Sequence, residues 1–123
     1  MTTMPASPKG VASTTALAST TADTFEQEVL SAPSPVLVDF WASHCRTCRA
    51  MEPVLEALAA EFDGRMRVLK LDVEAHPAVA DRFGVRSLPT LLLFQGGEVL
   101  GRTTGFVPRH TLGQHLDSVI TAN

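Results

Sequence analysis

The sequence lacks the residues that would mark several large classes of protein. It has only two cysteines, too few for the disulfide framework of a small secreted scaffold. Aromatic residues make up only 6% of the chain and no basic stripe accompanies the net charge of −3, which argues against nucleic-acid binding. No apolar run approaches the roughly 18 residues of a membrane span. We therefore expect neither nucleic-acid nor membrane partners, and the 123 residues are enough for one domain with a buried core.

The first 20 residues lack acidic side chains and a sustained apolar stretch. Twelve of these 20 residues are Ser, Thr or Ala, and Lys9 carries the only charge. The missing apolar stretch argues against a secretory signal, and the missing arginine argues against an organellar transit peptide. We expect a flexible tail over residues 1–20, a folded domain over residues 21–123 and a cytoplasmic location.

The two cysteines that are present are the most informative feature of the chain. Cys45 and Cys48 directly follow the strand-like run 36–41 and precede a helical pattern. This places Cys45 at a helix N-terminus, where backbone N–H groups and the helix dipole favour a thiolate. A reactive thiolate with a second thiol one turn away is typical of a dithiol/disulfide switch.

Two other interpretations of the cysteine pair must be weighed. A zinc site needs further ligands, and His44, His110 and His115 are the nearest candidates in type. However, about sixty residues separate Cys48 from His110, far more than the roughly 12–15 of a zinc finger. A purely structural bridge is also a poor explanation, because so small a loop restrains little of the unfolded chain. We therefore favour a redox pair that needs no metal.

Hydrophobic periodicity outlines the remaining elements. A short helix capped by Asp23 or Thr24 runs to about residue 30. A strand at 36–41 and a helix at 46–62 are expected next, followed by a second strand at 66–73 and a helix at 77–83. A hairpin then joins strands at 91–94 and 98–103, and the last helix begins at Pro108 or Arg109. This order predicts an α/β fold with a central mixed sheet and helices on both faces.

Over about residues 23–120 the chain resembles the thioredoxin family. The motifs that carry the resemblance are Val38-Asp39-Phe40-Trp41-Ala42 before the cysteine pair, Pro53, Lys70-Leu71-Asp72, the run 84–91 with Leu88-Pro89-Thr90, the turn 94–98, and Gly105. The resemblance implies a thioredoxin fold, a redox-active dithiol and no bound cofactor.

The chain departs from the usual family pattern at three places. His44 stands where the family usually has Trp, and Arg46-Thr47 stands where it usually has Gly-Pro. The segment 17–20, which should form the first strand, is unusually polar. The first two departures bear on redox potential and partner choice, and the third bears on the edge of the sheet.

The site residues fall into reacting and supporting groups. Cys45, exposed at the helix start, is expected to attack a substrate disulfide, and Cys48, one turn inward, to resolve the mixed disulfide. Asp39 stands in an apolar strand, so burial should raise the pKa of its carboxyl and make it a candidate proton acceptor for Cys48, as the resemblance also implies. Lys70, on the neighbouring strand, could reach Asp39 and moderate that shift.

The remaining candidates shape the site. Pro89 resembles the family's cis-proline, which faces the dithiol and leaves the backbone of Leu88 free to pair with an extended substrate. Trp41 is expected to pack beside the dithiol. The other site-shaping candidates are His44, Arg46, Thr47 and Gly105. Arg46 adds a permanent positive charge next to Cys45, and His44 can add a partial one on the other side.

These features together predict an enzyme, a thiol–disulfide oxidoreductase that reduces protein disulfides. Its expected partners are disulfide-containing proteins and a disulfide reductase that recycles it. One alternative is a more oxidising thiol oxidase or isomerase. The other is a non-catalytic binding module that uses the same fold to capture proteins or to share a metal or iron–sulfur site between two chains.

Overall fold

The computed structural model describes residues 17–122, so residues 1–16 of the predicted tail lie outside the described residues. The elements are, in chain order, β1 (Ala18–Ser19), the π-helical turn η2 (Glu26–Leu30), β2 (Val36–Trp41), α2 (Arg46–Glu61), β3 (Arg67–Asp72), α3 (Pro77–Arg82), β4 (Thr90–Gln95), β5 (Glu98–Thr104) and α4 (Arg109–Ala122). The predicted order of elements from residue 36 onward is confirmed.

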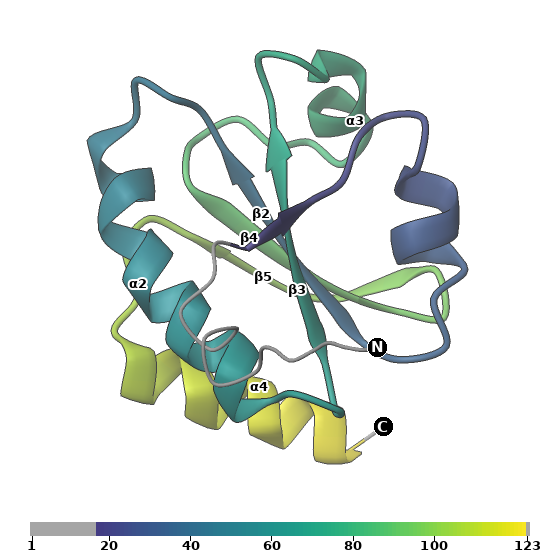
Figure 1. The fold of residues 1–123 in the computed structure, drawn as a ribbon, viewed down its shortest axis with the longest axis vertical. Helices are drawn as coiled ribbons and strands as arrows, with labels where there is room; N and C mark the ends of the chain where they lie inside the picture. The colour runs from purple at the N-terminus through teal and green to yellow at the C-terminus, as the bar shows by residue number, and fades with distance from the viewer. Residues whose placement is uncertain (1–16, 123) are drawn as a thin grey trace, which may run out of the picture.

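The strands form one mixed sheet in the order β1-β3-β2-β4-β5 (Figure 1). β1, β3 and β2 run parallel, whereas β4 pairs antiparallel with both β2 and β5. β2 and β4 are buried almost throughout, which explains why both read as nearly continuous apolar runs.

The sheet has a hydrophobic core on each face, as the alternation of side chains along a strand requires. On one face η2 and α3 pack against Val38, Phe40 and their neighbours. On the other face α2 and α4 pack against Leu37, Leu91 and Leu93 (Figure 1). The predicted central mixed sheet with helices on both faces is therefore confirmed.

The start of the domain differs in detail from the expectation. The turn before β2 closes with an i→i+5 bond from Ser31 N–H to the Glu26 carbonyl, and Phe25 is its N-cap without a side-chain hydrogen bond. The hydroxyl of Thr24 instead donates to the Glu28 carboxylate over 2.8 Å, so the predicted capping role is wrong.

The polar segment 17–20 does provide the first strand. Ala18 and Ser19 pair with β3, and the Thr20 N–H donates to the Lys70 carbonyl over 2.8 Å. The strand has only two residues, both exposed, which fits its polar composition. The boundary between a flexible tail over residues 1–20 and a folded domain over residues 21–123 stays a prediction.

Candidate active site

The two cysteines lie where the chain turns from β2 into α2. Cys45 has extended backbone, with φ −90° and ψ 110°, and is the N-cap of α2. Its Sγ accepts a 3.1 Å hydrogen bond from the Cys48 N–H, one of the groups that a helix start leaves unpaired. Cys45 and Cys48 form a disulfide with their Cα atoms 5.2 Å apart. The sulfurs thus meet across one helical turn, as their spacing predicts.

The two sulfurs differ in their access to solvent. Cys45 is half-buried at the surface, whereas Cys48 is only 4% exposed. Cys48 lies on the face of α2 that carries Met51 and Leu55 into the core. Cys45 is therefore the more accessible sulfur for a disulfide on another molecule, and Cys48 lies within bonding reach of Cys45. The pair can therefore form a mixed disulfide at one end and release it from the other.

Pro89 lies at the same end of the strands as the dithiol. The Leu88–Pro89 peptide bond is cis, as the family resemblance implies. β4 begins directly after Pro89 and runs antiparallel to β2, with Thr90 opposite Phe40, so the start of β4 meets the end of β2 that leads to Cys45. Gly105, with φ +80°, donates its N–H to the Pro89 carbonyl over 2.9 Å. The structure thus brings the predicted Pro89 and Gly105 together.

Asp39 is buried in β2 on the side that faces α2. The residue is 1% exposed, and its Oδ1 has no hydrogen-bond partner within residues 17–122. Burial raises the pKa of Asp39 to about 7; the Lys70 ammonium partly counteracts this rise and the Glu52 carboxylate adds to it. The predicted direction of the shift is confirmed. A carboxyl with this pKa can both take and give a proton near neutral pH.

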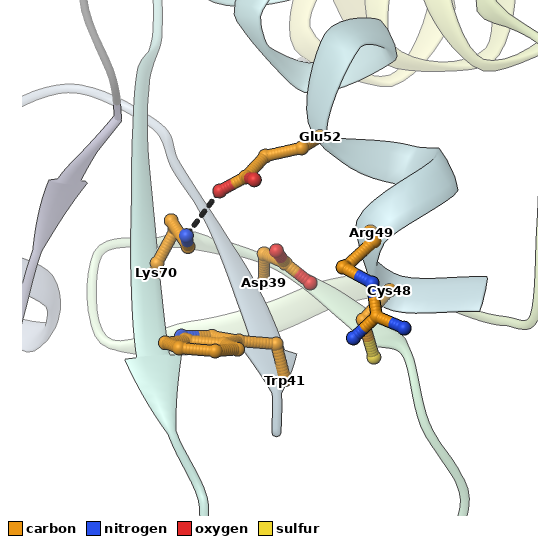
Figure 2. Close-up of a pocket in the computed structure, with 6 residues that line it drawn as sticks. All are labelled: Asp39, Trp41, Cys48, Arg49, Glu52 and Lys70. Carbon is orange, nitrogen blue, oxygen red and sulfur yellow. Dashed lines mark hydrogen bonds and ion pairs between the residues drawn. The ribbon is translucent and has the colours of Figure 1, made fainter. Parts of the chain in front are cut away.

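A small cavity connects Asp39 with the inner cysteine (Figure 2). Its volume is about 40 Å³, enough for a water molecule, and it is lined by Asp39, Trp41, Cys48, Arg49, Glu52 and Lys70. Trp41 is part of this lining, and its ring lies against the Lys70 ammonium; that Trp41 packs beside the dithiol stays a prediction. The cavity thus gathers residues from β2, β3 and α2 around the Asp39 carboxyl.

Lys70 lies on the strand next to Asp39 and moderates the rise in its pKa, as predicted. Its backbone is paired with that of Asp39, but its ammonium forms an ion pair with Glu52 and lies 4.3 Å from the centroid of the Trp41 ring. Sequence reasoning missed Glu52. The available signal was its position four residues after Cys48, which places both on one face of α2.

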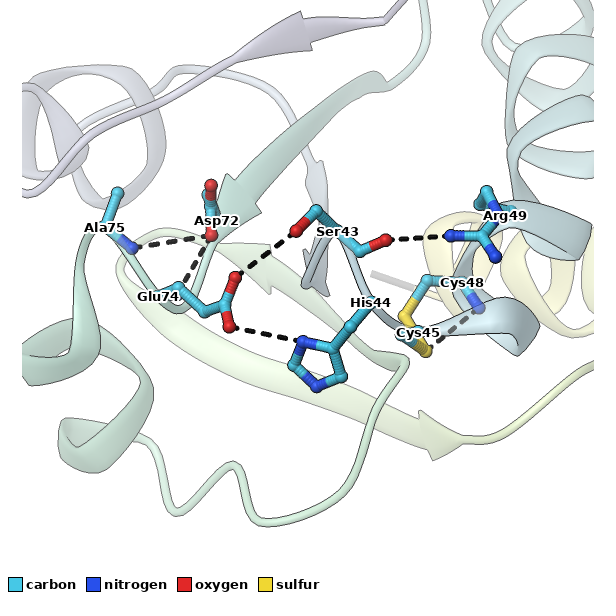
Figure 3. A network of polar contacts seen from close by, with 8 residues as sticks. All are labelled: Ser43, His44, Cys45, Cys48, Arg49, Asp72, Glu74 and Ala75. Carbon is cyan, nitrogen blue, oxygen red and sulfur yellow. Dashed lines mark hydrogen bonds and ion pairs between the residues drawn. A yellow bond between two sulfur atoms is a disulfide. The ribbon is translucent and has the colours of Figure 1, made fainter.

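A polar network holds the loop before Cys45 (Figure 3). The Glu74 carboxylate lies 3.2 Å from Nδ1 of His44 and accepts a 3.4 Å hydrogen bond from the Ser43 hydroxyl. The Arg49 guanidinium donates to the Ser43 carbonyl over 2.8 Å. His44 therefore contacts the loop after β3, and its side chain is 71% exposed. These contacts tie the loop both to the segment after β3 and to α2.

The other residues predicted for the site lie in three places: the exposed first turn of α2, the core, and α4. Arg46 and Thr47 are exposed in the first turn of α2, and Leu88 packs against the core on the face of η2 and α3. His110 and His115 lie on α4, outside the cavity. Within residues 17–122, no three His, Cys, Asp or Glu side chains gather as a metal site would require, and no helix is long and apolar enough to cross a membrane.

Comparisons with known proteins agree with the fold and the cysteine pair. The family model described as thioredoxin matches residues 16–118. Thioredoxin 1 of Nostoc sp. is 44% identical over 102 residues, which cover 83% of this chain and 95% of the relative. Thioredoxin C-2 of Corynebacterium nephridii is 40% identical over 104 residues, or 85% and 96% of the two chains. The thioredoxin of Porphyra purpurea is 41% identical over 97 residues, or 79% and 91%.

Proposed function

The chain belongs to the thioredoxin family and is a thiol–disulfide oxidoreductase that works through Cys45 and Cys48, and from this premise we propose how its residues divide the reaction. The single observation that carries the proposal is the unequal exposure of the two sulfurs. Cys45 caps a helix at the surface, and Cys48 faces a cavity that also holds Asp39. Neither the oxidase or isomerase nor the binding module is favoured by the relatives of this chain.

The reduction begins from the dithiol. The Cys45 thiolate attacks one sulfur of the substrate disulfide, a bond forms between Cys45 and that sulfur, and the other substrate sulfur leaves as a thiolate that takes up a proton. Cys48 then loses its proton to Asp39 and attacks Sγ of Cys45. The Cys45–Cys48 disulfide forms, the mixed disulfide breaks, and the second substrate sulfur leaves as a thiolate that takes up a proton, so two electrons have passed to the substrate.

The other residues of the site position the substrate. Pro89 and Gly105 support the loop next to the dithiol, and the backbone of Leu88 would pair with an extended stretch of the substrate. Trp41 lines the cavity that Cys48 also lines. His44, Arg46 and Thr47 line the approach to Cys45 and would influence which partners bind there.

The partners follow from the same chemistry. The substrates would be proteins with accessible disulfides, and the oxidised chain would be returned to the dithiol by a disulfide reductase that supplies two electrons. A reducing compartment such as the cytoplasm suits a protein whose working form is the dithiol.

Reduction of insulin driven by dithiothreitol tests the proposal. The wild-type protein should accelerate the precipitation of insulin chains well beyond dithiothreitol alone, and Cys45→Ser should remove the acceleration. Equal rates for the wild type and Cys45→Ser would contradict the assignment of Cys45 as the attacking thiol.

A further inference from the structure

Glu52 is the one acidic residue of the cavity lining, besides Asp39, and the proposed reaction does not use it. It extends from α2 toward β3, and its carboxylate forms an ion pair with the Lys70 ammonium (Figure 2). The side chain of Lys70 is 15% exposed and that of Glu52 is 35% exposed, so the pair lies at the rim of the cavity rather than in open solvent.

The charged and titratable groups around Asp39 come from β3 and α2. β3 contributes Lys70, and α2 contributes Cys48, Arg49 and Glu52. β4 contributes no charge, because the residue paired with Asp39 on that side is Leu91. Lys70 and Arg49 are thus the two cations that could pair with the Asp39 carboxylate.

Both cations are engaged elsewhere. Arg49 donates to the Ser43 carbonyl in the loop before Cys45. Lys70 is held by Glu52 and by the face of the Trp41 ring, and Figure 2 shows its contact with Glu52 and none with Asp39. Among the described residues, Asp39 Oδ1 therefore has no hydrogen-bond partner, although the Lys70 ammonium extends from the adjacent strand.

We propose that Glu52 is a positioning residue for the reaction: by binding the Lys70 ammonium at the rim of the cavity, it keeps this cation from pairing with Asp39 and leaves Asp39 free to take the proton of Cys48. The proposal rests on the role given above to Asp39. An ammonium bound directly to Asp39 would favour its ionised form and make it a weaker base. With Glu52 in place, the Glu52–Lys70 ion pair has almost no net charge, so burial is the main influence on the pKa of Asp39.

The pH titration of Asp39 measures this effect without any assay of activity. The oxidised protein, labelled with ¹³C at aspartate carboxyls, would be titrated by NMR, with the Asp39 signal assigned by its loss in Asp39→Asn. In the oxidised protein neither cysteine titrates, so Asp39 is observed without coupling to the thiols. Glu52→Gln should lower the Asp39 midpoint by about one pH unit, because Lys70 then has no other carboxylate partner within the cavity.

Four further variants separate this proposal from simpler explanations. Glu52→Asp, which keeps the charge, should stay near the wild-type midpoint. Glu56→Gln makes the same change one turn along α2 outside the cavity lining, and should leave the midpoint unchanged. In the Lys70→Met background, Glu52→Gln should lose most of its effect. Glu52→Met carries the same expectation as Glu52→Gln and serves if the latter does not fold.

The proposal is overturned if Glu52→Gln and Glu52→Met titrate like Glu56→Gln, or if Glu52→Gln shifts the midpoint equally with and without Lys70. A parallel pH profile of insulin reduction should move to lower pH with Glu52→Gln. If Asp39→Asn leaves that profile and its rates unchanged, the role of Asp39 in the reaction fails, while the NMR titration still decides whether Glu52 controls Lys70.

Discussion

At the scale of single residues, the burial of Asp39 should make the stability of the folded protein depend on pH. The folded-state pKa of about 7 exceeds the unfolded value of about 3.9, so the folded protein keeps a proton that the unfolded chain loses. The free energy of unfolding should therefore fall as pH rises from about 4 to about 7. Asp39→Asn cannot ionise, so above pH 8 it should be more stable than the wild type, by up to about 4 kcal/mol.

Urea denaturation at pH 4.5 and pH 8.5 measures the difference. The two proteins should be close in stability at the lower pH, and the advantage of Asp39→Asn should grow toward the higher pH. An advantage that is the same at both values would mean that ionisation of Asp39 is not its cause.

The same substitution should slow the reaction. If Asp39 accepts the Cys48 proton, Asp39→Asn should reduce the rate of insulin reduction near neutral pH by roughly 10–100-fold, toward the low end of the range for acid–base assistance. The release of the mixed disulfide should be the affected step, since attack by Cys45 does not need Asp39. Stopped-flow measurement of attack and release separates the two, and a wild-type release rate would remove Asp39 from the mechanism.

At the scale of elements, the first turn of α2 should set the redox potential. Arg46 is exposed beside Cys45, and its positive charge favours the thiolate at a helix start that already favours it. Stabilising the thiolate stabilises the reduced form, and about 1 kcal/mol corresponds to roughly 20 mV. Replacing Arg46-Thr47 with Gly-Pro should therefore make the potential more negative by an amount of this order.

Titration against glutathione buffers compares the two proteins. Arg46→Gln isolates the charge from the effect of the introduced proline, and should account for part of the change at low salt and less of it at 1 M salt. A potential that stays the same or becomes less negative with Gly-Pro would contradict the role given to Arg46.

Gly105, in the loop at the end of β5, has a backbone conformation that should be strained in any other residue. Gly105 has φ +80°, and nothing within 4 Å would obstruct an added methyl group, so Gly105→Ala should destabilise the protein through backbone strain alone, by about 1–2 kcal/mol. Gly113 lies inside α4, where a methyl group would contact Leu58 at 3.4 Å. Gly113→Ala should leave stability unchanged or raise it by up to about 1 kcal/mol. Equal losses in thermal denaturation would remove strain as the explanation.

The elements that the sequence predicted best are those whose signal is local. α2 was expected over 46–62 and is Arg46–Glu61, because apolar side chains recur at helical spacing after a cysteine that can cap it. The π-helical closure at Ser31 could not be predicted, since its apolar residues have the spacing of an ordinary helix. The Glu52–Lys70 pair was missed because it depends on how α2 lies over β3, which neither segment encodes by itself.

At the scale of the whole molecule, the sheet topology assembles the site. The parallel β2 and β3 bring Asp39 and Lys70 side by side, and the antiparallel β4 returns Pro89 to the edge where β2 leads into α2. Residues that are distant along the chain thus share one edge of the sheet. The resemblance to a family anticipated this arrangement, whereas the residues by themselves identified the cysteine pair by its spacing and Asp39 by its apolar strand.

The most direct test of the central claim is to trap the mixed disulfide. Cys48→Ser retains the attacking thiol but cannot resolve the adduct, so with a disulfide-containing protein it should accumulate a covalent complex that mass spectrometry locates at Cys45 and dithiothreitol releases. Cys45→Ser should form no such complex. Accumulation of an adduct by Cys45→Ser but not by Cys48→Ser would contradict the account.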